Sequence, residues 1–146
     1  MDYKFSNRMN LLKGSEIREL MALTARPEVI SFAGGMPAPE LFPCEAVKEA
    51  CIEVMDTMGQ KALQYMPTEG LVTLREKIVK RMEDKLNIKT DAAHVLLTSG
   101  SQQGLDFSAR VFLNPGDVVL MESPSYLGAV NAFKACEPTF VEVPTG

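Results

Sequence analysis

Apolar and polar positions along the second half of the chain follow two alternating rhythms, which together predict an α/β fold. Short apolar runs at 94–98, 118–121 and 139–143 are typical of strands, and the segments 102–113 and 126–135 have helical spacing. Strands that alternate with helices in this way pair in parallel, through right-handed crossovers. The pattern therefore predicts an open, doubly wound sheet, in which ligands bind at the carboxyl ends of the strands.

The first half of the chain is mostly helical by the same criterion. Three helices are predicted there, at 15–26, 43–59 and 71–86. Gly59 and Asn87 are the expected C-terminal stops of the second and third helices. Residues 1–14 are predicted to be an irregular arm, and glycine- and proline-rich segments at 33–39 and 63–70 are predicted to connect the helices.

The junction after the 94–98 strand is the clearest candidate site in the sequence. The strand stops at Ser99-Gly100-Ser101, and a helical pattern begins directly at Gln102. A helix that starts at a strand end presents unpaired N–H groups, backed by the positive end of the helix dipole. Such a helix start is suited to a phosphate or carboxylate. The next strand end, at 122–126, is expected to open on the same edge of the sheet.

Composition and charge exclude several classes of function. The net charge of −4 and the absence of a Lys/Arg stripe argue against nucleic acid as a partner. No apolar run is long enough to cross a membrane, and the polar start of the chain does not resemble a signal peptide. The three cysteines are scattered, which is typical of reduced thiols and predicts a cytoplasmic protein. A chain with one histidine, His94, and no paired cysteines is not expected to bind a metal.

The residues around the helix start narrow the choice of anion that could bind there. Gly100-Ser101-Gln102-Gln103-Gly104 lacks the lysine and the spacing of a Walker nucleotide loop, and the sequence has no G-x-G-x-x-G dinucleotide motif. Tyr126, at the neighbouring strand end, is a ring on which a planar ligand can stack. A flat phosphorylated ring such as pyridoxal 5'-phosphate (PLP) satisfies both features.

Five segments resemble, in the same order, motifs of the fold-type I PLP-dependent aminotransferases. The similarity is greatest to the branch that contains 2-aminoadipate, kynurenine and aromatic aminotransferases. The segments are Ile30-Ser31-Phe32-Ala33-Gly34-Gly35-Met36-Pro37 through Phe42-Pro43, Leu63-Gln64-Tyr65 with Gly70 and Leu74-Arg75, Thr98-Ser99-Gly100-Ser101-Gln102-Gln103-Gly104-Leu105, Asn114-Pro115-Gly116-Asp117, and Glu122-Ser123-Pro124-Ser125-Tyr126. One such match is weak evidence, but five in order are strong.

This resemblance implies an architecture. The chain is expected to form the start of the aspartate aminotransferase-like three-layer α/β/α fold, preceded by an N-terminal arm and helix. Residues 1–45 would form the arm and a substrate-side loop, and residues 46–146 the first part of the large PLP-binding domain. Members of the family have about 400 residues. The chain is therefore expected to be an N-terminal fragment with an incomplete sheet, in which the 94–98 strand lacks its neighbours.

The resemblance also implies roles for particular residues. The cofactor contacts would come from Gly100, Ser101 and Gln102 at the phosphate, Tyr126 on the pyridine ring, and Tyr65, which would reach the phosphate of the neighbouring subunit's cofactor in a homodimer. Gly35 would lie against the substrate and Arg18 at the substrate entrance. The substrates implied are an amino acid and a 2-oxo acid.

The catalytic groups of the family are expected outside these 146 residues. The chemistry requires a lysine that forms the Schiff base, an acidic partner for the pyridinium nitrogen and an arginine for the substrate carboxylate. No lysine of the chain lies in a matching motif, so no catalytic residue is assigned here. The alternatives are a PLP-dependent lyase or decarboxylase of the same fold, a truncated binding module, and a transcriptional regulator with an aminotransferase-like domain. No basic helix-turn-helix precedes the first motif, which argues against the regulator.

Overall fold

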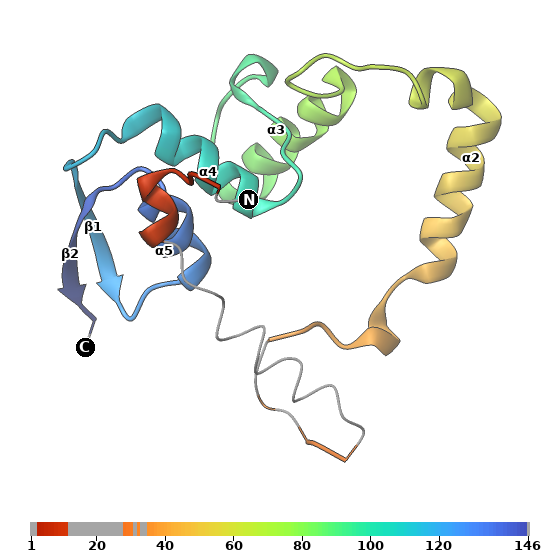
Figure 1. Cartoon of the computed structure of the whole chain (residues 1–146). Coiled ribbons are helices and arrows are strands. Elements are labelled where there is room, and N and C mark those ends of the chain that lie inside the picture. The colour runs from red at the N-terminus through yellow and green to blue at the C-terminus, as the bar shows by residue number, and fades with distance from the viewer. Residues whose placement is uncertain (1–2, 12–27, 31, 33–34, 146) are drawn as a thin grey trace. The chain divides into compact units, whose positions relative to one another are not determined.

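A computed structural model describes residues 3–11, 28–30, 32 and 35–145 of the chain (Figure 1). The chain forms two compact units, one of Met1–Gly14 with Thr98–Gly146 and the other of Ser15–Leu97. The helix predicted at 15–26, and Arg18 with it, lies outside the described residues. The division predicted at residue 45 concerns the domains of a whole enzyme and stays a prediction.

The Ser15–Leu97 unit is built on two helices, as the sequence pattern predicts. Its described elements are the 3₁₀ turn η2 (Pro39–Leu41), helix α2 (Cys44–Ala62), helix α3 (Val72–Leu86) and the 3₁₀ turn η3 (Ala92–His94). The stop predicted at Gly59 is wrong, because α2 continues to Ala62; the helical geometry is broken only locally, at Met58 (φ −147°, ψ 24°). Asn87 ends α3 in the left-handed conformation (φ 55°), which confirms its predicted role.

The strand predicted at 94–98 is wrong for this chain. His94 belongs to η3, which Asp91 caps by accepting a hydrogen bond from the Ala93 N–H at 2.7 Å. Residues 95–98 have no strand partner in the part of the chain that the structure describes. An apolar run forms a β-ladder only when a neighbouring strand satisfies its backbone groups. The expectation that this segment lacks its neighbours is thus confirmed.

Arg75 holds the loops of this unit together. Its Nε donates a hydrogen bond to the Gly70 carbonyl at 3.2 Å, and its Nη1 donates to the Ala92 carbonyl at 2.6 Å. The Leu97 N–H donates to the Glu69 carbonyl at 3.0 Å. Gly70 has φ +95° and lies against the Leu97 side chain. A methyl group on the Gly70 α-carbon would be only 2.4 Å from Leu97 Cδ1. The Arg75 guanidinium therefore joins the turn before α3 to the start of η3, and the Leu97–Glu69 hydrogen bond joins the same turn to the segment that leaves η3.

The second unit is a β-α-β arrangement preceded by a helix. Its elements are the 3₁₀ turn η1 (Asn7–Leu11), helix α4 (Ser101–Phe112), strand β1 (Val118–Ser123), helix α5 (Leu127–Lys134) and strand β2 (Thr139–Pro144). The predicted parallel pairing is confirmed, because β1 and β2 form a parallel two-stranded sheet with Val118 opposite Thr139 (Figure 1). The turn η1 replaces part of the arm that was predicted to be irregular.

The turn at 114–117 aligns the amino ends of β1 and β2. Asp117 Oδ2 accepts hydrogen bonds from the N–H of Asn114 at 2.7 Å and from its Nδ2 at 3.2 Å. The Gly116 N–H donates to the Glu137 carbonyl at 2.8 Å, and the Thr139 N–H donates to the Asp117 carbonyl, also at 2.8 Å. The turn thus joins the end of α4 to the starts of both strands.

Burial within this unit is concentrated on its helices. Among the described residues the buried hydrophobic side chains are Ala109 of α4 and Ala132 of α5. One face of the sheet remains exposed, through Val118, Leu120, Val141 and Val143. Parallel sheets are normally covered on both faces. The incomplete sheet predicted from the sequence is therefore confirmed.

We expect replacement of Arg75 by alanine to destabilise the protein. Two hydrogen bonds from a partly buried guanidinium to backbone carbonyls would be lost, and hydrogen bonds from charged groups contribute about 1.5–3 kcal/mol each. Urea unfolding of the intact protein measures this loss. Arg81→Ala, at an exposed position on the same helix, is the matched control and should change stability by less than about 0.5 kcal/mol. Equal effects of the two variants would contradict this role of Arg75.

Candidate functional site

Gly100 sets the geometry of the helix start that the sequence indicates. It occupies the N-cap position of α4 with φ 86° and ψ 169°, a conformation that glycine adopts readily and other residues rarely adopt. No side chain caps this end of α4. The first N–H groups of a helix have no intrahelical acceptor, so those of Ser101 and Gln102 can receive an anion.

Two side chains fix the turn that leads into α4. Thr98 Oγ1 donates a hydrogen bond to the Gly100 carbonyl at 3.1 Å. The Ser99 N–H donates to Gln103 Oε1 at 2.6 Å. Gln103 lies at the third helical position, from which a glutamine side chain reaches back to the residues before the helix. The turn is therefore held in place from both sides while the α4 N–H groups stay available.

Gln102 connects this turn to the neighbouring helix. Its Nε2 donates a hydrogen bond to the Gly128 carbonyl at 3.0 Å. Gly128 lies in the first turn of α5, and α4 and α5 pack against each other (Figure 1). The starts of the two helices are thus joined by one hydrogen bond between residues 26 positions apart.

Tyr126 lies at this same junction. It is the N-cap residue of α5, directly after the loop that follows β1, and its side chain is 68% exposed. Its ring lies against Gly128, where a methyl group would be 2.5 Å from Cε1 and 2.7 Å from Oη of the tyrosine. Gly128 therefore accommodates the ring because it has no side chain.

The loop between β1 and Tyr126 is fixed by polar contacts. The Ser123–Pro124 peptide bond is cis, and Ser125 Oγ donates a hydrogen bond to the Glu122 carbonyl. Ser123 Oγ donates to Glu142 Oε2 on β2 at 3.0 Å. These contacts hold the chain at the carboxyl ends of the strands, just before Tyr126.

The structure brings together four of the seven predicted site residues. Gly100, Ser101, Gln102 and Tyr126 lie in one unit, around the starts of α4 and α5. Tyr65 and Gly35 lie in the other unit, which is described separately. Tyr65 is 98% exposed, and Gly35 has φ 55° with open space at its α-carbon.

Sequence reasoning missed the two residues that support this group, Gln103 and Gly128. Gln103 is part of the matching motif. Its hydrogen bond with the Ser99 N–H, however, depends on the rotamer of the glutamine side chain, which residue spacing does not determine. A glycine two residues after the aromatic residue, inside a predicted helix, was a usable signal for Gly128. A helical glycine costs about 1 kcal/mol relative to alanine and often indicates close packing.

The charged residues of α4, Asp106 and Arg110, lie away from its first turn. On α4 the hydrogen bond that Asp106 accepts from Arg110 raises the pKa of that guanidinium, but the pair is exposed and lies beyond the first helical turn. Within the described ranges, no group of three His, Cys, Asp or Glu side chains is arranged to hold a metal ion. Nor does any helix among these residues have the length and apolar character needed to span a membrane.

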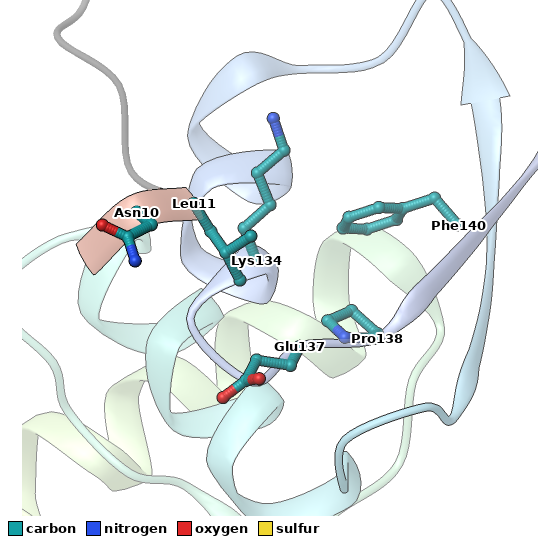
Figure 2. A pocket seen from close by; sticks show the side chains of 6 residues that line it. All are labelled: Asn10, Leu11, Lys134, Glu137, Pro138 and Phe140. Atoms are coloured by element: carbon teal, nitrogen blue, oxygen red, sulfur yellow. The ribbon is translucent and has the colours of Figure 1, made fainter. Parts of the chain in front are cut away.

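A pocket in the same unit lies away from the starts of α4 and α5. It is lined by residues from η1, from the end of α5 and from the start of β2, namely Asn10, Leu11, Lys134, Glu137, Pro138 and Phe140 (Figure 2). In Figure 2 the Lys134 and Glu137 side chains extend in different directions, so their charges do not converge on one ligand. The pocket is at the amino end of β2, whereas Tyr126 follows the carboxyl end of β1.

Comparison with protein families identifies this arrangement. Residues 27–146 match the model of the family described as aminotransferase class I and II. The chain belongs to this aminotransferase family. It is 45% identical to aromatic-amino-acid aminotransferase 1 of Thermococcus litoralis over 146 residues, which are 99% of this chain and 35% of that protein.

Solved aminotransferase structures share the fold. The kynurenine aminotransferase of Pyrococcus horikoshii, in complex with PMP, matches with a TM-score of 0.88 and 42% identity over 97% of this chain and 35% of that one. The α-aminoadipate aminotransferase of Thermus thermophilus, complexed with N-(5'-phosphopyridoxyl)-L-leucine, matches with a TM-score of 0.81 and 42% identity, over 97% and 34% of the two chains.

The chain therefore has the fold of one part of these enzymes. It spans about a third of the length of the relatives it matches. The family and the start of the aspartate aminotransferase-like fold, both expected from the sequence motifs, are confirmed.

Two glycines of α4 provide a matched test of the helix start. Gly100→Ala should destabilise the intact protein by about 1–3 kcal/mol, because alanine is strained at φ 86°. Gly104→Ala should be neutral or stabilise it by up to about 1 kcal/mol, since the new methyl group would be 3.9 Å from Thr98 Oγ1 and alanine favours the helix. Chemical denaturation measures both values. A Gly100→Ala variant as stable as Gly104→Ala would refute the assigned backbone conformation.

Proposed function

We propose that this chain forms the N-terminal part of a PLP-dependent aminotransferase, which moves an amino group between an amino acid and a 2-oxo acid. One observation carries the proposal: an uncapped helix start at Gly100–Gln102 and an exposed aromatic ring at Tyr126 lie at two neighbouring helix starts, joined by a hydrogen bond. Family membership and the PMP and phosphopyridoxyl complexes of similar structures support the same conclusion.

The start of α4 is suited to the phosphate of PLP. The N–H groups of Ser101 and Gln102 would donate to phosphate oxygens, aided by the positive end of the helix dipole. The space beside the Gly100 α-carbon is open, so a phosphate can approach the backbone there. Thr98 and Gln103 keep the turn in this conformation through their hydrogen bonds.

Tyr126 would hold the pyridine ring by stacking on it. Offset stacking of aromatic rings contributes about 0.5–1.5 kcal/mol beyond the area buried. When bound, PLP supplies the electron sink that lets an amino acid lose its α-proton and its amino group. The residues of this chain would bind and orient the cofactor for that chemistry.

The remaining groups of the site would come from other parts of the assembled enzyme. Gly35 and Arg18 are proposed to border the substrate, and Tyr65 is proposed to reach the cofactor phosphate of a second subunit. Tyr65 is exposed, so its ring is accessible to a second chain. The lysine that binds the cofactor covalently is proposed to lie outside these 146 residues.

The intact protein is expected to bind PLP and to catalyse transamination. With added PLP it should show the visible absorbance band of the bound cofactor, and with an amino acid and 2-oxoglutarate it should form glutamate. Tyr126→Ala should lower the affinity for PLP about tenfold, because the stacking surface is removed. Release of CO₂ or of an olefinic product without glutamate would favour a decarboxylase or lyase of the same fold. Absence of the absorbance band would refute the cofactor.

Hybrid dimers test the role proposed for Tyr65. A dimer of one Tyr65→Phe subunit and one Tyr126→Ala subunit has one site with both tyrosines intact, provided that Tyr65 acts across the interface. Such hybrids should retain about half of the wild-type activity per dimer, whereas both parent homodimers should be impaired. If Tyr65 acts within its own subunit, every site of the hybrid is defective and activity stays at the level of the parents.

A further inference from the structure

The Gln102 side chain makes an unexpected contact for a residue in the first turn of a helix. It does not cap α4, whose N-cap has no side-chain hydrogen bond. Instead its amide crosses to α5 and donates to the Gly128 carbonyl at 3.0 Å. An amide nitrogen has two hydrogens, and this contact uses one of them. The side chain is therefore already engaged by the protein before any ligand arrives.

Gly128 is also the residue on which the Tyr126 ring rests. The ring edge formed by Cε1, Cζ and Oη lies where the side chain of any other residue at 128 would be. The peptide carbonyl and the α-carbon of Gly128 thus contact Gln102 and Tyr126, respectively. A displacement of the Gly128 backbone would move the surface that supports the ring.

We propose that Gln102 is a positioning residue for Tyr126, acting through Gly128. Its hydrogen bond fixes the first turn of α5 relative to the first turn of α4, and so sets the position of the tyrosine ring relative to the anion-binding N–H groups. The inference deepens the proposed function and rests on it for the identity of the ligand, PLP. It differs from the role implied by family resemblance, in which the Gln102 side chain contacts the phosphate.

A double-mutant cycle separates these two roles. Gln102→Leu, Tyr126→Ala and the double variant are made in the intact protein, and the dissociation constant for PLP is measured by absorbance titration. If Gln102 acts through Tyr126, Gln102→Leu should weaken PLP binding about tenfold alone but less than about twofold once Tyr126 is alanine. Equal losses in both backgrounds would overturn the proposal, because a direct phosphate contact does not depend on the ring.

Gly128→Ala tests the same pathway without removing a polar group. Alanine favours the helix by about 0.5–1 kcal/mol, while its methyl group would displace the hydroxyl end of the Tyr126 ring. The variant should unfold at the same or a higher temperature than wild type, yet bind PLP more weakly and change the visible circular dichroism of the bound cofactor. Gly104→Ala, in the other helix, is the control and should leave both signals unchanged. A Gly128→Ala protein with wild-type affinity and dichroism would refute the role of this contact.

A measurement without cofactor keeps the inference distinct from the proposed function. With 3-fluorotyrosine placed at position 126, the ¹⁹F resonance of the cofactor-free protein reports the surroundings of the ring. We expect Gln102→Leu and Gly128→Ala to shift this resonance and Ser108→Ala, on the exposed surface of α4, to leave it in place. Failure of the protein to bind PLP would contradict the proposed function alone. An unshifted resonance in both site variants would contradict the positioning role.

Discussion

The packing of α4 against α5 is the contact on which the candidate site depends. Ala109 and Ala132, one on each helix, are the buried hydrophobic side chains of the described residues. Small side chains allow helix backbones to approach closely, and tight packing transmits small shifts instead of absorbing them. Ala109 is seven residues after Gln102 on α4, and Ala132 is four residues after Gly128 on α5, so helical spacing puts each alanine on the face that carries the Gln102–Gly128 hydrogen bond. We therefore expect a larger residue at either position to separate the helices and lengthen this hydrogen bond. The geometry of the anion site is thus fixed partly by two alanines that would never contact the ligand.

The far end of the sheet contributes to the same geometry. The hydrogen bonds of Gly116 and Thr139 hold the amino ends of β1 and β2 level, and the parallel register continues to Ser123 opposite Pro144. Because the register is uniform, the carboxyl ends of β1 and β2 are aligned too. Tyr126, which follows β1, therefore lies beside the start of α4. The Asn-Pro-Gly-Asp turn is therefore a structural motif, although it lies several turns of helix away from the residues proposed to bind the cofactor.

Much of this architecture could be predicted from the sequence, because short-range signals determine it. The helix stop at Asn87, the start of a helix directly after the Ser99-Gly100-Ser101 turn and the parallel pair after residue 118 all follow from local residue chemistry or from alternation of elements. The strand expected at 94–98 was wrong, since pairing depends on a neighbour that no local pattern reveals. The support of Tyr126 by Gly128 could not be predicted either, because it depends on the rotamer of one ring.

The exposed sheet face formed by Val118, Leu120, Val141 and Val143 has a consequence for the behaviour of the chain in isolation. Each strand of the described sheet also has one edge without a partner strand. Apolar faces and open strand edges promote the addition of strands from other molecules. These residues would therefore drive self-association in the 146-residue chain alone, and a second layer over the sheet would keep such a chain from associating through this face.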